Sequence, residues 1–471
     1  MRNKIKQGIT ILLVVLLVHS GSLPTARAFT IGEERELGEK LLYQVRSAFP
    51  IIGDPDLHRY INDLGQEVLD VAGIQFFEYR FFIVKSKQFN AFAAPSGLIF
   101  FYTELIQSMD SEDELVSVIA HEIGHVAKRH LASRMKKGTI VNIAALGAAL
   151  AAIALGGGGA ASQALLTGSL AAGQSAQLYF SREDEKEADL LAYHWLKELG
   201  RNPDGQRKML QTMRRITRYR MGQVPQYLLT HPDPEARLDY VESLIAAEGG
   251  ASEAPDQTKD FSFLRFKYRI MALVEDNAAA KAYFANRLND SRSTSFSKTM
   301  ARYGLSQIFR RENNYEQALS LLNEVIATLP RQRILRVDQA IILAEQGDFE
   351  QARDLLETAL REQPTDMYTA FHLAGVLEKI GELERAEYLL REVVARMPEF
   401  SSAFFDLGRI LSHQGKKAEA RFFLGKFNLY EGKLDLAQAN FKEVIGAPQA
   451  DPAIQRESEA MLELIERLKK G

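Results

Sequence analysis

The chain has 471 residues, of which 46% are hydrophobic and 25% charged, so it can bury a large apolar core. Its formal net charge is −3, from 58 basic and 61 acidic side chains, and this balance gives no indication of nucleic-acid binding or of attraction to anionic lipid. The sequence has no cysteine, which excludes disulfide bonds and a lipid-anchored N-terminal cysteine.

Residues 1–28 have the pattern of a secretory signal. Basic residues near the start precede an apolar stretch from Ile9 to Val18, and Ala26-Arg27-Ala28 supplies the small residues of a cleavage site. The apolar stretch is shorter than a membrane-spanning helix normally requires. We therefore predict that the mature chain begins at Phe29 and is a soluble protein of the periplasm, stabilised by its core rather than by disulfides.

Residues 29–248 are predicted to form one mixed domain. Helices are expected over residues 33–45 and 55–71, and a small sheet follows from three β-rich stretches: 79–84, 89–94 and 98–102. Asn90–Ala94 is our candidate for an edge strand, where an extended peptide can be bound through main-chain hydrogen bonds. An interior hairpin is an equally good explanation of this segment.

The central motif of this domain, His121-Glu122-Ile123-Gly124-His125, has the form His-Glu-x-x-His. Ser111 and Glu114 form a predicted capping box ahead of apolar residues at helical spacing, so the motif is expected on a helix. Two imidazoles four residues apart project from one helical face and can bind Zn²⁺, while the Glu122 carboxylate can take a proton from zinc-bound water. Gly124 lowers helix propensity by roughly 1 kcal/mol relative to Ala, which suggests close backbone packing near the metal.

Residues 138–181 contain no Asp, Glu, Lys or Arg and are rich in Ala, Leu and Gly. The simplest interpretation is two Ala-rich helices that are joined by a flexible Gly loop and packed near the active site. A more specific form of this interpretation is that the two helices form a lid over the active site. Contact with a membrane is the alternative, although Asn142 and the many Ala residues make the segment only marginally apolar. Its position after the motif is compatible with gating in either case.

A catalytic zinc site needs a third protein ligand and leaves the fourth position to water. Glu185 and Asp189 lie four residues apart and therefore face the same way on a predicted helix. We assign Glu185 as the ligand and Asp189 as the acceptor for the distal ring N–H of a zinc-binding histidine. Spacing alone leaves the neighbouring carboxylates open as ligands: Glu183, Asp184 and Glu187.

The C-terminal part is predicted to be a repeat array, with a linker over residues 249–260, connecting helices over 261–296 and the repeat domain over 297–471. Sets of Ala, Leu, Gly and Pro each recur at an interval of 34 residues; the alanines are Ala318, Ala352, Ala386 and Ala420. This period and these residue types are those of the tetratricopeptide repeat. Stacked helix pairs form a concave groove that suits peptide segments.

Three motifs together resemble a known family: His-Glu-x-x-His, the Ser-Arg-x-x-Glu-x-x-Ala-Asp pattern from Ser181 to Asp189, and Thr230-His231-Pro232. The chain is similar to the HtpX-type and CAAX-prenyl-protease-type zinc peptidases, and its repeats bring it closer to their soluble periplasmic branch, the beta-barrel assembly-enhancing proteases. The resemblance covers nearly the whole mature chain. It implies an α+β zincin-like metalloprotease domain, mostly helical with a small sheet, followed by an all-α tetratricopeptide solenoid. It also implies one Zn²⁺ per chain, with Glu122 as general base and three ligands: His121, His125 and Glu185.

His231 and Arg237 complete the candidate site. In similar enzymes this histidine lies near the metal, where it can donate to the oxyanion or occupy the open coordination position and keep the enzyme latent. A turn fixed by proline that opens a helix at Glu235 would explain the segment without chemistry, and Arg237 can simply pair with the acidic cluster. His130, one turn past the motif, is expected to be an exposed helix residue.

These observations predict a periplasmic zinc metalloendopeptidase that degrades misassembled or stalled proteins. The resemblance suggests outer-membrane β-barrel precursors as clients, with the repeat domain binding clients or the barrel-assembly machinery. An unfinished barrel exposes unpaired strands, which suit docking on an edge strand. The alternative is an assembly chaperone or adaptor with a largely latent protease site. Neither hypothesis involves nucleic acid, and both leave room for peripheral membrane contact through residues 138–181.

Overall fold

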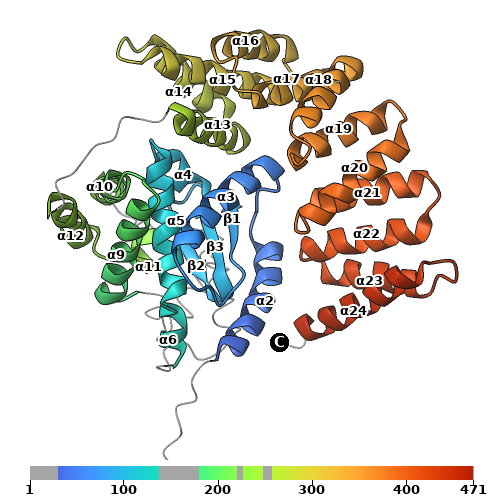
Figure 1. The fold of residues 1–471 in the computed structure, drawn as a ribbon, viewed down its shortest axis with the longest axis horizontal. Coiled ribbons are helices and arrows are strands. Elements are labelled where there is room, and N and C mark those ends of the chain that lie inside the picture. Colours follow the sequence, from blue (N-terminus) through green and yellow to red (C-terminus); the bar gives the residue numbers. More distant parts are fainter. Residues whose placement is uncertain (1–29, 137–179, 220–225, 248–256, 470–471) are drawn as a thin grey trace, which may run out of the picture.

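The computed structural model describes residues 30–136, 180–219, 226–247 and 257–469 (Figure 1). It is mostly helical, with one small sheet in the N-terminal part and stacked helix pairs after it, so the predicted fold class is confirmed. The expectations for the secretory signal, for residues 138–179 and for residues 249–256 of the predicted linker lie outside the described residues. The last four residues of the predicted linker, 257–260, are instead the first turn of a helix, Gln257–Val274. Within the described ranges, no helix combines the length and the apolar character that a membrane span requires.

The N-terminal part contains both helices that the sequence predicts near its start. In the second of them, the Asp54 side chain accepts hydrogen bonds from the backbone of Asp56 and Leu57, and Pro55 occupies the first helical position, where its missing N–H costs nothing. The elements of this part, in chain order, are α2 (Ile31–Ala48), α3 (Pro55–Val71), β1 (Arg80–Val84), β2 (Ala91–Ala94), the 3-10 turn η2 (Pro95–Gly97), β3 (Leu98–Tyr102), α4 (Thr103–Ser108), α5 (Glu112–Ala127), α6 (His130–Lys136), α9 (Arg182–Glu198), α10 (Asp204–Tyr219), α11 (Gln226–Thr230) and α12 (Pro234–Ala247).

The three strands form a mixed sheet in the order β1-β3-β2, in which β3 pairs parallel with β1 and antiparallel with β2. Alternate residues face opposite sides, and both sides are covered. Phe81 and Phe101 lie in the core that includes α3 and α5, whereas Phe82 and Phe100 pack against α2. Because β2 has β3 as its one strand neighbour among the described residues, it is an edge strand, which is one of the two alternatives considered for this segment, and it lies beside α5.

The helix α5 carries the His-Glu-x-x-His motif and begins as the sequence suggests, with one difference. Ser111 accepts a hydrogen bond from the Glu114 N–H at 3.4 Å, but the Glu114 carboxylate binds the Ser111 hydroxyl and the Asp110 N–H instead of closing a reciprocal capping box. Gly124 explains the close packing expected near the motif. A Cβ atom there would lie 3.2 Å from the Ala188 Cα, so α5 and α9 approach almost backbone to backbone.

The C-terminal part is the predicted repeat array, whose helices pair antiparallel and stack in sequence (Figure 1). Gly347, Gly381 and Gly415 have φ values of 99°, 88° and 78°, and Asn313 takes the same left-handed turn in the first repeat with φ 59°. The helices are α13 (Gln257–Val274), α14 (Asn277–Asn289), α15 (Ser295–Arg311), α16 (Tyr315–Thr328), α17 (Ile334–Gln346), α18 (Phe349–Glu362), α19 (Met367–Lys379), α20 (Leu383–Arg396), α21 (Ser401–His413), α22 (Lys417–Tyr430), α23 (Leu434–Ile445) and α24 (Pro452–Lys469).

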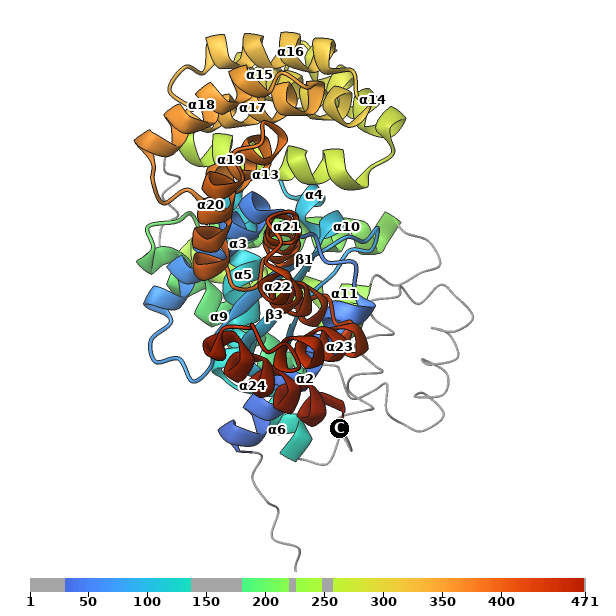
Figure 2. The same cartoon turned by 90° about the vertical axis from the view of Figure 1, so that its right-hand side faces the viewer.

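The array curves around the N-terminal part, with α13 to α18 at one end of it and α19 to α24 along its side (Figures 1 and 2). Buried ion pairs hold the two parts together. Arg265 of α13 binds Asp338 of α17 at 2.7 Å and Asp56 of α3 at 2.5 Å, and Arg269 also contacts Asp56. Burial raises the pKa of Asp56, but the neighbouring arginines Arg265 and Arg269 outweigh burial and hold this pKa well below its usual range. Because breaking such a pair leaves a buried charge uncompensated, the network fixes how the array docks.

Candidate metal centre

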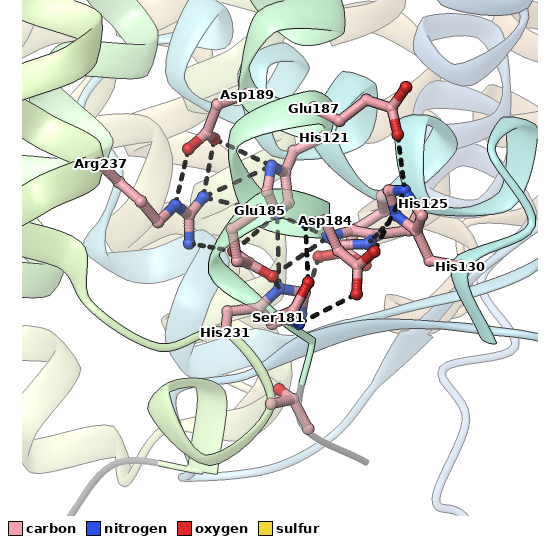
Figure 3. Close-up of polar contacts among 12 residues, drawn as sticks. His121, His125, His130, Ser181, Asp184, Glu185, Glu187, Asp189, His231 and Arg237 are labelled. Carbon is pink, nitrogen blue, oxygen red and sulfur yellow. Dashed lines mark hydrogen bonds and ion pairs between the residues drawn. The ribbon is translucent and has the colours of Figure 1, made fainter. Parts of the chain in front are cut away.

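Four buried side chains from separate parts of the chain converge beside the sheet (Figure 3). His121 and His125 come from α5, Glu185 comes from the first turn of α9, and His231 follows α11. Each offers one possible ligand atom, these atoms all lie within 4.8 Å of one another, and each residue is at most 2% exposed. The cluster can therefore hold a metal ion, and it contains the three residues that the sequence analysis assigns as ligands together with His231.

The start of α9 explains why Glu185 is the carboxylate that reaches the histidines. Ser181 accepts from the Asp184 N–H at 3.1 Å and the Asp184 side chain accepts from the Ser181 N–H at 3.0 Å, a capping box that fixes the first helical turn. Glu183 is exposed, Asp184 is used by the cap, and Glu187 contacts Lys128 at the surface. Among the four candidate carboxylates, Glu185 is the one that is buried and reaches both His121 and His125.

The ligand atoms are arranged around a common point. His121 Nε2 lies 3.0 Å from His125 Nε2, and the Glu185 oxygens lie 3.5 Å and 3.4 Å from these two nitrogens, respectively. His231 Nδ1 is 3.0 Å from Glu185 Oε1 and 3.4 Å from His121 Nε2. Neutral imidazole nitrogens and carboxylate oxygens present lone pairs, so a cation at their centre satisfies all of them together. This donor set suits zinc and other transition metals.

Glu122 lies beside this cluster with an unusual environment for a carboxylate. The residue is fully buried, and neither carboxylate oxygen has a hydrogen-bond partner among the described residues. His231 Nε2, at 3.5 Å from Glu122 Oε1, is the ring nitrogen turned towards it. An isolated buried carboxylate is costly, and a neighbouring cation offsets that cost. The same position suits a base that does not coordinate the metal.

Asp189 and Arg237 support the cluster from behind. Asp189 Oδ1 lies 3.0 Å from His121 Nδ1, a distance at which it can accept a hydrogen bond from the ring. The Arg237 guanidinium donates to both Asp189 oxygens, at 2.7 Å and 2.8 Å, and its remaining nitrogen lies 2.8 Å from Glu185 Oε2. Pairing of Arg237 with the acidic segment, one of our two expectations for it, is therefore observed.

The charges of the cluster follow from burial and these partners. Burial holds the pKa of His125 well below its usual range. Burial and Arg237 act against the charged form of His121, but Asp189 and Glu185 outweigh them and raise its pKa to about 9. Burial raises the pKa of Glu185, whereas Arg237 and His231 hold it well below its usual range.

Three neighbours of the cluster were not predicted from the sequence. His130 is not exposed as expected but 5% exposed, because the chain turns back at Arg129 and brings the His130 ring against His125. Phe180 stacks on His125 with ring centroids 3.8 Å apart, and Tyr227 stacks on His231 at 4.3 Å. One indication for His130 was present in the sequence, its position five residues after His125. In a straight helix, however, the His130 side chain would point away from His125. The two aromatic residues gave no signal, since their contacts depend on how separate segments pack.

Comparison with known families agrees with this geometry. Residues 55–245 match Peptidase family M48 and residues 309–374 match the tetratricopeptide repeat. Residues 55–245 are thus similar to this peptidase family and residues 309–374 to the tetratricopeptide repeat, which agrees with the resemblance drawn from the motifs.

Several individual proteins are similar to this chain. The Beta-barrel assembly-enhancing protease of Escherichia coli strain K12 is 30% identical over 306 residues, which cover 64% of this chain and 61% of that protein. The Metalloprotease LoiP of the same strain is 29% identical over 36% of this chain and 63% of its own length. The Mitochondrial metalloendopeptidase OMA1 of Schizosaccharomyces pombe is 26% identical over 40% of this chain and 52% of its own. The match thus spans about three fifths of the E. coli protease.

Solved structures give only a weak likeness. YrrB, described as a TPR protein with an unusual peptide-binding site, is 17% identical over 43% of this chain and 97% of that chain, with a TM-score of 0.28. A likeness of this size carries no argument.

Proposed function

We propose that the protein is a zinc-dependent endopeptidase of the periplasm that degrades misassembled or stalled proteins. The observation that carries this proposal is the buried convergence of His121, His125 and Glu185, with the Glu122 carboxylate, which accepts no hydrogen bond from the described residues, beside them. The M48 match over residues 55–245 supports the same reaction class. The proposed organisation is a signal over residues 1–28, a peptidase domain over 29–248 and a repeat domain over 297–471.

Zinc would be held by the two imidazoles and Glu185, and when bound it would polarise a peptide carbonyl and make water more acidic. The other steps belong to the chain itself. Glu122, which is not a ligand in this proposal, accepts a proton from the attacking water and delivers it to the leaving amine. Asp189 holds His121 in the tautomer whose Nε2 lone pair faces the centre. Arg237 neutralises part of the negative charge that Glu185 and Asp189 bring into a buried site.

The proposed substrates are unfolded polypeptides, and outer-membrane β-barrel precursors in particular. β2 is an edge strand beside α5, so an extended segment added to it would run close to the histidines through main-chain bonds alone. A barrel precursor offers unpaired strands for such pairing. The client class also takes support from the name of the E. coli relative, a Beta-barrel assembly-enhancing protease. The repeat array would bind clients or the assembly machinery and raise the local concentration of the segment to be cut.

A second candidate is an assembly chaperone or adaptor whose protease site is latent. The observation that favours it is the position of His231, whose Nδ1 is part of the ligand cluster and would take the coordination position that water needs. The two candidates can be separated in cells. Glu122→Gln abolishes the biological function of a protease, whereas an adaptor keeps it.

The decisive test measures zinc content and peptide cleavage on the purified mature protein. We expect one zinc per chain in the wild type, unchanged zinc but no cleavage in Glu122→Gln, and zinc well below one per chain in Glu185→Ala. Glu183→Ala, which changes an exposed carboxylate on the same helical turn, is the matched control and should behave as wild type. If Glu185→Ala still binds one zinc per chain, the third ligand is another residue. If the wild type binds no zinc after zinc has been resupplied, the enzymatic proposal is wrong. A pull-down with Glu122→Gln should then trap uncut clients.

A further inference from the structure

His130 lies beside the metal-binding cluster without belonging to it. Its side chain is 5% exposed, with Nδ1 at 2.9 Å from His125 Nδ1 and Nε2 at 3.1 Å from Glu187 Oε2 (Figure 3). Figure 3 shows the two rings adjacent, with Glu187 on the far side of His130. No contact joins His130 to the reacting side of the cluster, where Glu122 lies, in the part of the chain that the structure describes.

The backbone is held in an uncommon conformation to produce this contact. Arg129 has φ 52°, which lies in the left-handed region. For a residue with a large side chain, this conformation is unfavourable by about 1 kcal/mol. The Arg129 guanidinium makes two contacts with the buried Glu34 carboxylate, at 3.0 Å and 2.8 Å, which anchor the turn between α5 and α6. A left-handed turn that is anchored by a partly buried ion pair indicates that the position of His130 matters to the fold or to the site.

The contacts determine where the ring protons lie. His125 Nε2 faces the cluster, 3.4 Å from Glu185 Oε1, so in a metal-binding tautomer its proton is on Nδ1. Two ring nitrogens 2.9 Å apart need one donor and one acceptor, and His130 Nδ1 must therefore accept from His125. The proton of His130 is then on Nε2, from which it donates to Glu187 Oε2.

We infer that His130 is a positioning residue of the zinc site, which accepts from His125 Nδ1–H and is itself oriented by Glu187. The inference rests on the proposed zinc function, because it takes His125 to bind through Nε2. According to this inference, the two ligand histidines have different hydrogen-bond partners. The His121 ring contacts the Asp189 carboxylate directly, whereas the His125 ring contacts the His130 imidazole, which in turn contacts the Glu187 carboxylate at the surface. Loss of such a partner usually weakens metal binding by about 10- to 100-fold.

Two amide variants separate positioning from packing. In His130→Asn the amide oxygen can take the place of Nδ1 and accept from His125, whereas in His130→Gln the amide reaches the place of Nε2 and leaves His125 without an acceptor. His130→Ala removes both contacts. Lys128→Ala is the matched control, because Lys128 binds the same Glu187 carboxylate at 2.7 Å and takes no part in the inferred chain.

The test is chelator competition for zinc on the full mature protein, with peptide cleavage as a second measurement. We expect zinc affinity to fall about 10- to 100-fold in His130→Ala and in His130→Gln, and to stay within about threefold of wild type in His130→Asn and in Lys128→Ala. Wild-type affinity in His130→Ala, or equal losses in the Asn and Gln variants, would overturn the inference. A wild type that binds no zinc would instead contradict the proposed function itself.

A spectroscopic measurement keeps the inference testable if a variant does not fold. Nitrogen-15 NMR of the histidine rings in zinc-loaded wild type should find His130 protonated on Nε2 and bare on Nδ1, and His125 protonated on Nδ1. The opposite tautomer of His130 would refute the assigned direction of the chain, whatever the variants do.

Discussion

Arg237 grips Asp189 with two parallel hydrogen bonds, Nε to Oδ2 at 2.7 Å and Nη2 to Oδ1 at 2.8 Å, and both side chains are buried. Burial raises the pKa of Asp189, but Arg237 and His121 outweigh it and lower the value to about 2, so the carboxylate is ionised where it meets His121. One arginine thus holds in place the group that orients a ligand histidine.

Because of this pairing, we expect Arg237→Met to destabilise the protein strongly. The substitution leaves a buried carboxylate without its partner, so the free energy of unfolding should fall by about 3 kcal/mol. Arg237→Lys should recover only part of this loss, since an ammonium group cannot make the parallel pair. Urea unfolding measures both. The control is Arg218→Ala, which removes an exposed pair with Glu235 and should cost no more than about 0.5 kcal/mol; an equal loss in the two would refute the prediction.

His231→Ala should raise basal proteolysis. His231 Nδ1 lies 3.0 Å from Glu185 Oε1 and 3.4 Å from His121 Nε2, inside the ligand set, so we expect this ring to compete with water for the open position. Zinc content should remain at one per chain, because the other three ligands are unchanged. The rate of cleavage of an unfolded protein decides the matter. A lower cleavage rate would indicate that His231 stabilises the oxyanion. An unchanged rate would indicate that His231 has only a structural role in the turn.

Two glycines within helices should respond in opposite ways to Ala. At Gly375 a Cβ meets nothing within 4 Å, so Gly375→Ala should raise stability by about 0.5 to 1 kcal/mol through helix propensity. At Gly124 the same atom lies 3.2 Å from the Ala188 Cα, which cannot move without shifting α9. Gly124→Ala should therefore lose stability and bind zinc more weakly, because Glu185 moves with α9. Thermal unfolding and chelator competition measure the pair, and a stabilised Gly124→Ala would show that α5 and α9 are not tightly packed.

Glu114 should make the protein less stable as pH rises. Burial raises its pKa from 4.5 to about 7, although the Asp110 N–H opposes the change. Its stabilising contribution is complete below about pH 4.5 and is lost as the pH rises through about 7, since the unfolded chain gives up the proton first. Relative to wild type, Glu114→Gln should gain about 2 kcal/mol between pH 5 and pH 8.

The measurement is urea unfolding of chelator-treated protein at both pH values, so that zinc binding does not enter. Glu183→Gln, at an exposed carboxylate, provides the comparison. If the two variants track wild type equally across this range, Glu114 is not buried in the way the structure has it.

The sequence by itself determined those features that repeat or lie close together along the chain. Helical spacing places His121 and His125 on one face, four residues apart place Glu185 and Asp189 together, and a 34-residue period defines the array, because each depends only on local geometry. Tertiary structure alone decided which carboxylate of the acidic segment faces α5, that His130 is buried, and that Arg237 joins Asp189 to Glu185. These contacts join elements far apart in sequence through packing, and spacing carries no information about how two helices meet.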